Sequence, residues 1–135
     1  IRAGRIGHLE AMMSMLPPVM REQAVMVTGS MTTKKGKAER EQAIEDMRLG
    51  RKKFLFATYS LAKEGLDIPR LDSMYLASPQ RDFAVIVQSL GRISRTFEGK
   101  TDARCFDFVD YKIKTLLKFF KQRERTYRKL GCEEL

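Results

Sequence analysis

Residues 54–69 read FLFATYSLAKEGLDIP, and this stretch indicates the fold of the chain most directly. Its first four residues are apolar without polar alternation, as expected of a strand buried on both faces of a sheet. Residues 60–64 fit one helical turn, which Gly65 breaks. We therefore predict a strand over 54–57 that ends at Thr58 and is followed by a short turn of helix.

Similar apolar runs recur along the chain and alternate with stretches of helical periodicity. They predict strands over 24–27, 73–77 and 103–109, and helices over 7–16, 37–49, 83–95 and 113–130. Short apolar strands that alternate with helices predict an α/β fold with a mostly parallel sheet flanked by helices. The chain opens on a helix-like segment, so we expect it to lack the first strand of the sheet, before Ile1.

Polar residues stand where the predicted strands end. Thr28 and Gly29 follow the first strand, Thr58 follows the second and Ser78 the third. Parallel sheets bind their ligands at these carboxyl ends, where hydroxyl groups can donate to phosphate oxygens. Asp67, after a flexible glycine, can accept a hydrogen bond from a ribose hydroxyl. The alternative is an ordinary turn between strand and helix in which Asp67 only caps.

The helix predicted over 83–95 carries a polar stripe. Gln88, Arg92 and Arg95 stand at positions i, i+4 and i+7 of one helical face. The opposite face is apolar and is made by Phe83, Ile86, Val87, Leu90 and Ile93. Guanidinium groups carry a fixed charge and a planar fork of donors that matches phosphate oxygens, so the stripe predicts a polyphosphate site. The alternative is a basic face that only contacts water.

Size and charge narrow the classes of function. The chain has 135 residues, of which 43% are hydrophobic, and its 26 basic and 17 acidic residues give a net charge of +9. This charge predicts a polyanionic partner, or alternatively a basic surface that serves only solubility. No apolar run approaches about 20 residues, so we expect no membrane span. His8 is alone, and Cys105 and Cys132 lack the spacing of metal ligands, so we expect no metal site and a reducing, intracellular compartment.

Taken in order, these segments resemble motifs IV to VI of superfamily 2 helicases. Residues 5–9 (RIGHL) resemble the start of the helix after motif IV, and residues 53–58 with 64–69 are similar to motif V. Residues 88–95 (QSLGRISR) are similar to motif VI, with Ser89 where many members have arginine and Ser94 where many have glycine or alanine. The resemblance is closest to DNA-repair, recombination and phage or viral helicases, since motif VI of DEAD-box RNA helicases usually begins with histidine.

The resemblance implies a fold and a division of the chain. Residues 1–110 would form the second RecA-like lobe of the motor, a three-layer domain, and residues 111–135 a basic helix packed on or extending that lobe. The full-length protein would hydrolyse ATP with Mg²⁺, bound mainly by an N-terminal RecA-like lobe that this chain does not contain. No Gly-x-x-x-x-Gly-Lys-Ser/Thr sequence occurs, so we expect this chain alone to be inactive as an ATPase.

The resemblance also implies roles for single residues. Arg92 and Arg95 would be arginine fingers that reach the γ-phosphate of ATP, and Gln88 would position the nucleotide or couple the lobes. Gly65 and Asp67 would approach the ribose. The contacts with the sugar-phosphate backbone of a nucleic acid, with DNA favoured over RNA, would come from Thr28, Gly29 and Thr58. An alternative function remains, a nucleic-acid-binding module that keeps the fold without enzymatic activity.

Overall fold

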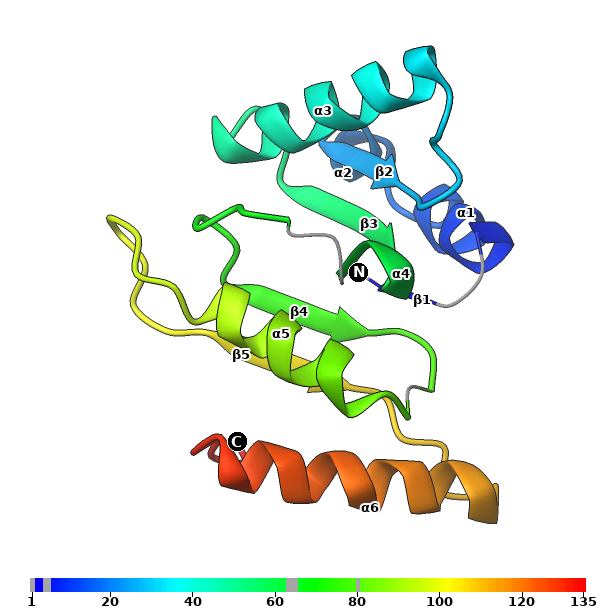
Figure 1. Ribbon diagram of the computed structural model, residues 1–135, viewed down its shortest axis with the longest axis vertical. Helices are drawn as coiled ribbons and strands as arrows, with labels where there is room; N and C mark the ends of the chain where they lie inside the picture. Colours follow the sequence, from blue (N-terminus) through cyan, green and yellow to red (C-terminus); the bar gives the residue numbers. More distant parts are fainter. Residues whose placement is uncertain (1, 4–5, 63–65, 80) are drawn as a thin grey trace.

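Parallel strands alternate with helices through the computed structural model, which describes residues 2–3, 6–62, 66–79 and 81–135. The strands are β1 (Arg2–Ala3), β2 (Ala24–Val27), β3 (Phe54–Thr58), β4 (Ser73–Leu76) and β5 (Arg104–Asp107). The helices are α1 (Ile6–Ser14), α2 (Pro18–Glu22), α3 (Lys34–Arg48), α4 (Tyr59–Ala62), α5 (Phe83–Ile93) and α6 (Lys114–Lys129). The strands form one five-stranded sheet in the order β2-β3-β1-β4-β5, and the pairs within it are parallel (Figure 1).

Strand β3 shows how the sheet receives helices on both faces. Alternate residues of a strand point to opposite faces. Leu55 and Ala57 belong to a core that includes Met47 of α3, whereas Phe56 is fully buried against Leu9 of α1. The result is three layers, with α3, α4 and α5 over one face of the sheet and α1 on the other (Figure 1).

Helix α6 lies beside β5 and is fixed there by a buried ion pair. The Arg123 guanidinium donates to both carboxylate oxygens of Asp107, from Nε at 2.7 Å and from Nη2 at 2.9 Å. The Tyr127 hydroxyl donates to the same carboxylate at 2.6 Å. Burial lowers the pKa of Arg123, but the hydrogen bonds and charge of Asp107 outweigh it and raise the pKa overall. Burial and the Asp107 carboxylate both raise the pKa of Tyr127. Tyr127 thus belongs to the buried face of α6, as its place in the apolar stripe predicts.

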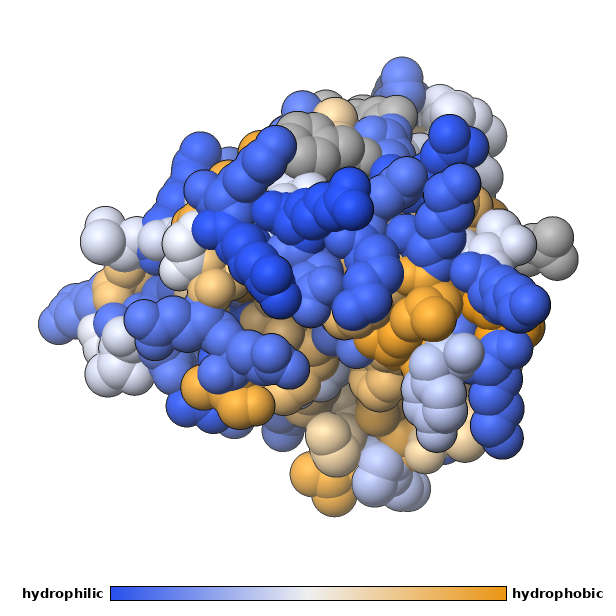
Figure 2. Space-filling model, turned by 90° about the horizontal axis from the view of Figure 1, so that it is seen from below, coloured by the Kyte–Doolittle hydropathy of each residue, from blue (hydrophilic) through white to orange (hydrophobic). Residues whose placement is uncertain are grey.

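The outer face of α6 is basic. Its exposed cations are Lys114, Lys118, Lys121, Arg125, Arg128 and Lys129. Glu124 pairs with Lys121 at 3.3 Å and with Arg128 at 3.1 Å. Figure 2, which views the molecule from the α6 side, shows hydrophilic side chains across much of this face, with apolar patches between them. Within the described ranges, no helix combines the length and the apolar character that crossing a bilayer requires.

The predicted strands are confirmed as β2 to β5, and the structure adds β1, which was not predicted. The expectation that strand residues precede Ile1 stays a prediction. Arg2 and Ala3 form a two-residue strand at the centre of the sheet, where Arg2 pairs with Ala57 of β3 and with Leu76 of β4. A segment of two residues is too short to show the alternation of a strand in its sequence. Only its pairing with β3 and β4 identifies β1 as a strand. Helix α2 was not predicted either; Pro18 occupies a first-turn position, where its missing N–H costs nothing.

Helix α5 is shorter than predicted. It begins after Asp82, whose carboxylate accepts from the Ala84 amide at 3.0 Å, and ends at Ile93 rather than at residue 95. Ser94 is the C-cap, and its hydroxyl donates to the Leu90 carbonyl at 2.8 Å. Arg95 therefore lies just beyond the helix, so the predicted stripe of three residues on one helical face is wrong at its last member.

Candidate functional site

Arg92 and Arg95 converge on the segment that follows α4. Arg92 Nη1 donates a hydrogen bond to the Leu66 carbonyl, and Arg95 Nη1 forms an ion pair with the Asp67 carboxylate. The side chains of Arg95 and Asp67 are 53% and 54% exposed. Each of these contacts uses one terminal nitrogen of a fork that carries five donors, so donors remain for an anion that approaches from solvent.

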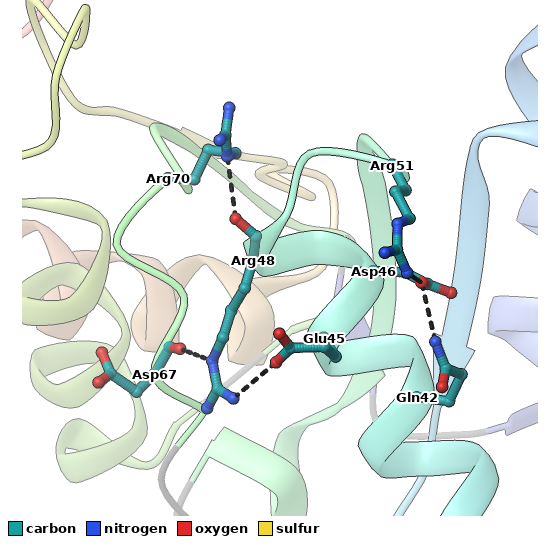
Figure 3. A network of polar contacts seen from close by, with 7 residues as sticks. All are labelled: Gln42, Glu45, Asp46, Arg48, Arg51, Asp67 and Arg70. Atoms are coloured by element: carbon teal, nitrogen blue, oxygen red, sulfur yellow. Dashed lines mark hydrogen bonds and ion pairs between the residues drawn. The ribbon is translucent and has the colours of Figure 1, made fainter.

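The segment from Leu66 to Leu71 is held by further cationic side chains through its backbone carbonyls. Arg48, the last residue of α3, donates from Nε to the Asp67 carbonyl at 2.8 Å, and Figure 3 shows its side chain extended from the helix to that carbonyl. Glu45 holds the same guanidinium at 3.3 Å. Lys100 Nζ donates to the Leu71 carbonyl at 2.7 Å. The position of Asp67 is therefore set by α3, α5 and the chain after α5 together.

A second group lies at the carboxyl ends of β2 and β3. Thr28 Oγ1 is 2.8 Å from Ser30 Oγ, and Thr58 Oγ1 is 3.0 Å from Ser60 Oγ. The Gly29 amide donates to Thr58 Oγ1 at 3.3 Å, which joins the two strand ends. The threonines are only 5% and 7% exposed, whereas both serines are exposed. Two exposed serines are thus hydrogen-bonded to buried threonines at this edge of the sheet.

The described site residues lie in two groups, which correspond to the two ligands that the motif resemblance implies. Helix α5 runs back from the carboxyl end of β4 toward its amino end (Figure 1), so Arg92 and Arg95 lie away from the edge that holds Thr28 and Thr58. Gln88 is exposed on α5, one helical turn before Arg92. Gly65 lies outside the described residues. Among the residues that are described, no three His, Cys, Asp or Glu side chains gather as a metal site requires.

Comparison with known families identifies the chain. The family model described as Helicase conserved C-terminal domain matches residues 2–97. The chain belongs to this family. It is the C-terminal lobe of a superfamily 2 helicase, as the ordered motifs predict.

Two curated relatives carry helicase names. The putative mitochondrial ATP-dependent helicase irc3 of Schizosaccharomyces pombe is 38% identical over 74 residues, which are 54% of this chain and 12% of that protein. Putative helicase 22 of Sulfolobus islandicus filamentous virus is 30% identical over 94 residues, 70% of this chain and 16% of that protein. The helicase lobe thus spans less than a fifth of either relative.

Solved structures agree on the fold. The C-terminal domain of the DEAD-box protein Dbp5 superposes with a TM-score of 0.70 at 23% identity, over 98% of this chain and 69% of that chain. S. cerevisiae Dbp5 bound to RNA and ADP BeF3 gives 0.69 at 23% identity, over 93% of this chain and 31% of that one. These likenesses confirm the RecA-like lobe, while the predicted kinship with DNA-repair and viral helicases stays a prediction.

Two positions within motif VI of this helicase lobe, 89 and 91, differ in burial. The Ser89 side chain is 4% exposed and donates to the Val85 carbonyl at 2.6 Å, so serine is satisfied inside the lobe. Gly91 is exposed, and a Cβ built there would meet no atom of the described chain within 4 Å. Its own lobe therefore does not require glycine at position 91.

The sequence did not indicate two residues that shape the site, Arg48 and Lys100, and it indicated Ser30 only as part of the segment 28–30, without a role. Arg48 contacts a carbonyl 19 residues away, and Lys100 contacts carbonyls 29 and 31 residues away. Local periodicity carries no signal for such contacts. Ser30 follows Thr28 and Gly29 directly, and its exposure beside a buried threonine is the feature that distinguishes it.

Proposed function

We propose that this domain is the second motor lobe of an ATP-dependent nucleic-acid helicase or translocase, in which Arg92 and Arg95 act on the γ-phosphate of ATP. The observation that carries the proposal is the convergence of both guanidiniums on the Leu66–Asp67 segment, with the Arg95 side chain half exposed. ATP, with Mg²⁺, supplies the phosphoryl group, and a first lobe outside this chain binds most of it.

The residues present fit a polyphosphate. Phosphoryl transfer spreads negative charge over the equatorial oxygens, and a positioned arginine that meets this charge is worth about 10³–10⁵ in rate. Arg95 can direct its remaining donors to phosphate oxygens. Its partner, the Asp67 carboxylate, can accept a hydrogen bond from a ribose hydroxyl. Gln88 is exposed on α5, where it can contact the nucleotide or the facing lobe. A role for Gly65 beside the ribose rests on the motif resemblance alone.

We assign the polynucleotide contact to the group at the ends of β2 and β3. The exposed residues Ser30 and Ser60 donate from their hydroxyls to backbone phosphates, and each shares a hydrogen bond with a buried threonine, Thr28 or Thr58, which holds it in place. The separation of this group from the arginines suits a motor that binds two different ligands. The net charge of +9 supports a polyanion. The DNA preference follows from the motif resemblance, whereas the similar Dbp5 structure has RNA bound. Competition between single-stranded DNA and RNA of one sequence tests it.

The decisive experiment replaces the arginines in the full-length protein. We expect Arg92→Ala and Arg95→Ala each to lower nucleic-acid-stimulated ATP hydrolysis by about 10³-fold or more and to leave nucleic-acid binding largely intact. The matched control is Arg104→Ala, which removes an arginine that pairs with Asp102 and whose exposure, 54%, is close to the 53% of Arg95. Wild-type turnover by either arginine variant would exclude the finger role.

The second candidate is a nucleic-acid-binding module without enzymatic activity. The exposed basic face of α6 favours it, because a polyanion could bind there without any nucleotide. It predicts binding by this chain alone that weakens steeply with salt, together with no ATPase activity in the full-length protein. Stimulated ATPase activity in the full-length protein would decide in favour of the motor.

A further inference from the structure

The ammonium group of Lys100 is surrounded by backbone carbonyls. Its Nζ lies 2.7 Å from the Arg95 carbonyl, 2.7 Å from the Leu71 carbonyl and 3.3 Å from the Pro69 carbonyl. An ammonium has three donors, so the chain itself uses all of them. Removal from water lowers the pKa of Lys100, and the charge of Asp72 partly opposes this. The Lys100 ammonium group therefore holds segments of the main chain together and is not merely a charge on the surface.

The three carbonyls belong to the two segments that form the arginine site. Pro69 and Leu71 follow Asp67 by two and four residues, in a stretch without helix or strand. The third carbonyl is that of Arg95, the residue whose side chain pairs with Asp67. Lys100 thus connects the main chain on either side of the Arg95–Asp67 pair.

The turn after Arg95 places Lys100 beside the Pro69 and Leu71 carbonyls. Gly99 has a φ of +80°, a conformation in which a side chain is strained, and the Lys100 amide donates to the Phe97 carbonyl at 3.0 Å. The Arg70 guanidinium lies over the Phe97 ring at 4.7 Å, a second link between the two segments. Arg48 contacts the Leu66–Leu71 segment twice, from its Nε to the Asp67 carbonyl at 2.8 Å and through its own carbonyl, which accepts from Arg70 Nε at 3.2 Å. Lys100 differs from Arg48 in that its side chain bonds to the main chain of both segments.

We propose that Lys100 is a positioning residue of the ATP site, which fixes the backbone of Arg95 relative to Asp67 through its three carbonyl contacts. The inference rests on the proposed function, because it concerns the placement of Arg95. Lys100 acts through Arg95 and does not itself contact the nucleotide. Without it, both segments keep their sequence and their other contacts but lose the three hydrogen bonds that join their main chains through one ammonium group.

The test uses Lys100→Met in the full-length protein, with Lys35→Met as the matched control, because the Lys35 side chain on α3 is 88% exposed and belongs to neither group of the candidate site. We expect Lys100→Met to lower kcat by about 100-fold, the effect of displacing a reacting group by about 1 Å, and to change KM for ATP by less than about 3-fold. Without nucleotide, hydrogen exchange should quicken in peptides covering 66–72 and stay unchanged in β2 and β3. The control should match wild type in each measurement.

A double variant separates positioning from general loss of structure. In single-turnover hydrolysis, adding Lys100→Met to Arg95→Ala should slow the reaction no further, because Lys100 acts through the missing side chain. Multiplied effects, or a wild-type kcat in Lys100→Met, would overturn the inference. Wild-type hydrolysis by Arg95→Ala would instead overturn the proposed function. If Lys100→Met does not fold, Lys100→Arg is measured in the same way, since a planar guanidinium does not reproduce the donor geometry of an ammonium group, and a normal kcat there overturns the inference.

Discussion

Replacing Asp107 by alanine should destabilise the lobe far more than the same change at Asp102. Both aspartates pair with an arginine at similar distances, 2.7 Å for Arg123–Asp107 and 2.8 Å for Arg104–Asp102. They differ in burial: the first pair is 5% and 10% exposed, and the second 54% and 53%. Asp107→Ala leaves a buried guanidinium without its carboxylate and removes the acceptor of the Tyr127 hydroxyl, so we expect a loss of about 3–5 kcal/mol. Asp102→Ala should cost about 0–1 kcal/mol.

Urea unfolding followed by circular dichroism measures this difference. With a slope of about 1–3 kcal/mol per molar urea, Asp107→Ala should lower the midpoint by more than about 1 M, whereas Asp102→Ala should barely move it. The double change Asp107→Leu with Arg123→Met should recover much of the loss, because it leaves no unpaired charge inside. Equal losses for the two alanine variants would refute the claim that burial decides the strength of these pairs.

Two other predictions concern the cysteines and the glycines. Burial, with the nearby Asp107 charge, raises the pKa of Cys105 to about 11, so iodoacetamide at pH 8 should alkylate it about 100-fold more slowly than an unshifted thiol and well behind the exposed Cys132. A raised pKa means that the folded state holds the proton more tightly, so this stabilisation persists below pH 9 and disappears as the pH rises toward 11; equal labelling of the two thiols would contradict both points. Gly50→Ala should destabilise by about 1–2 kcal/mol, because Gly50 has a φ of +74°, whereas Gly91→Ala, inside α5 and in open space, should stabilise by about 0.5–1 kcal/mol. Urea midpoints that move in the same direction would contradict this contrast.

The candidate site could be predicted in its parts but not in its arrangement. Motif order identified Arg92, Arg95 and Asp67, and the ends of the strands identified Thr28, Gly29 and Thr58. The structure adds that the threonine side chains are buried and that Arg95 lies beyond its helix. Helix ends and burial depend on neighbours from other parts of the chain, so local patterns constrain them only weakly.

The sequence by itself determined the alternation of strands and helices, because apolar runs and helical periodicity are local properties that each segment carries alone. It also determined the family, through the order and spacing of short motifs. Only the tertiary structure decided that Arg2 and Ala3 form the central strand, that Arg48 and Lys100 hold the backbone around Asp67, and that Arg123 lies buried on Asp107. These features join residues many positions apart, and the carbonyl or carboxylate that a cationic side chain reaches is set by how the packed elements direct it.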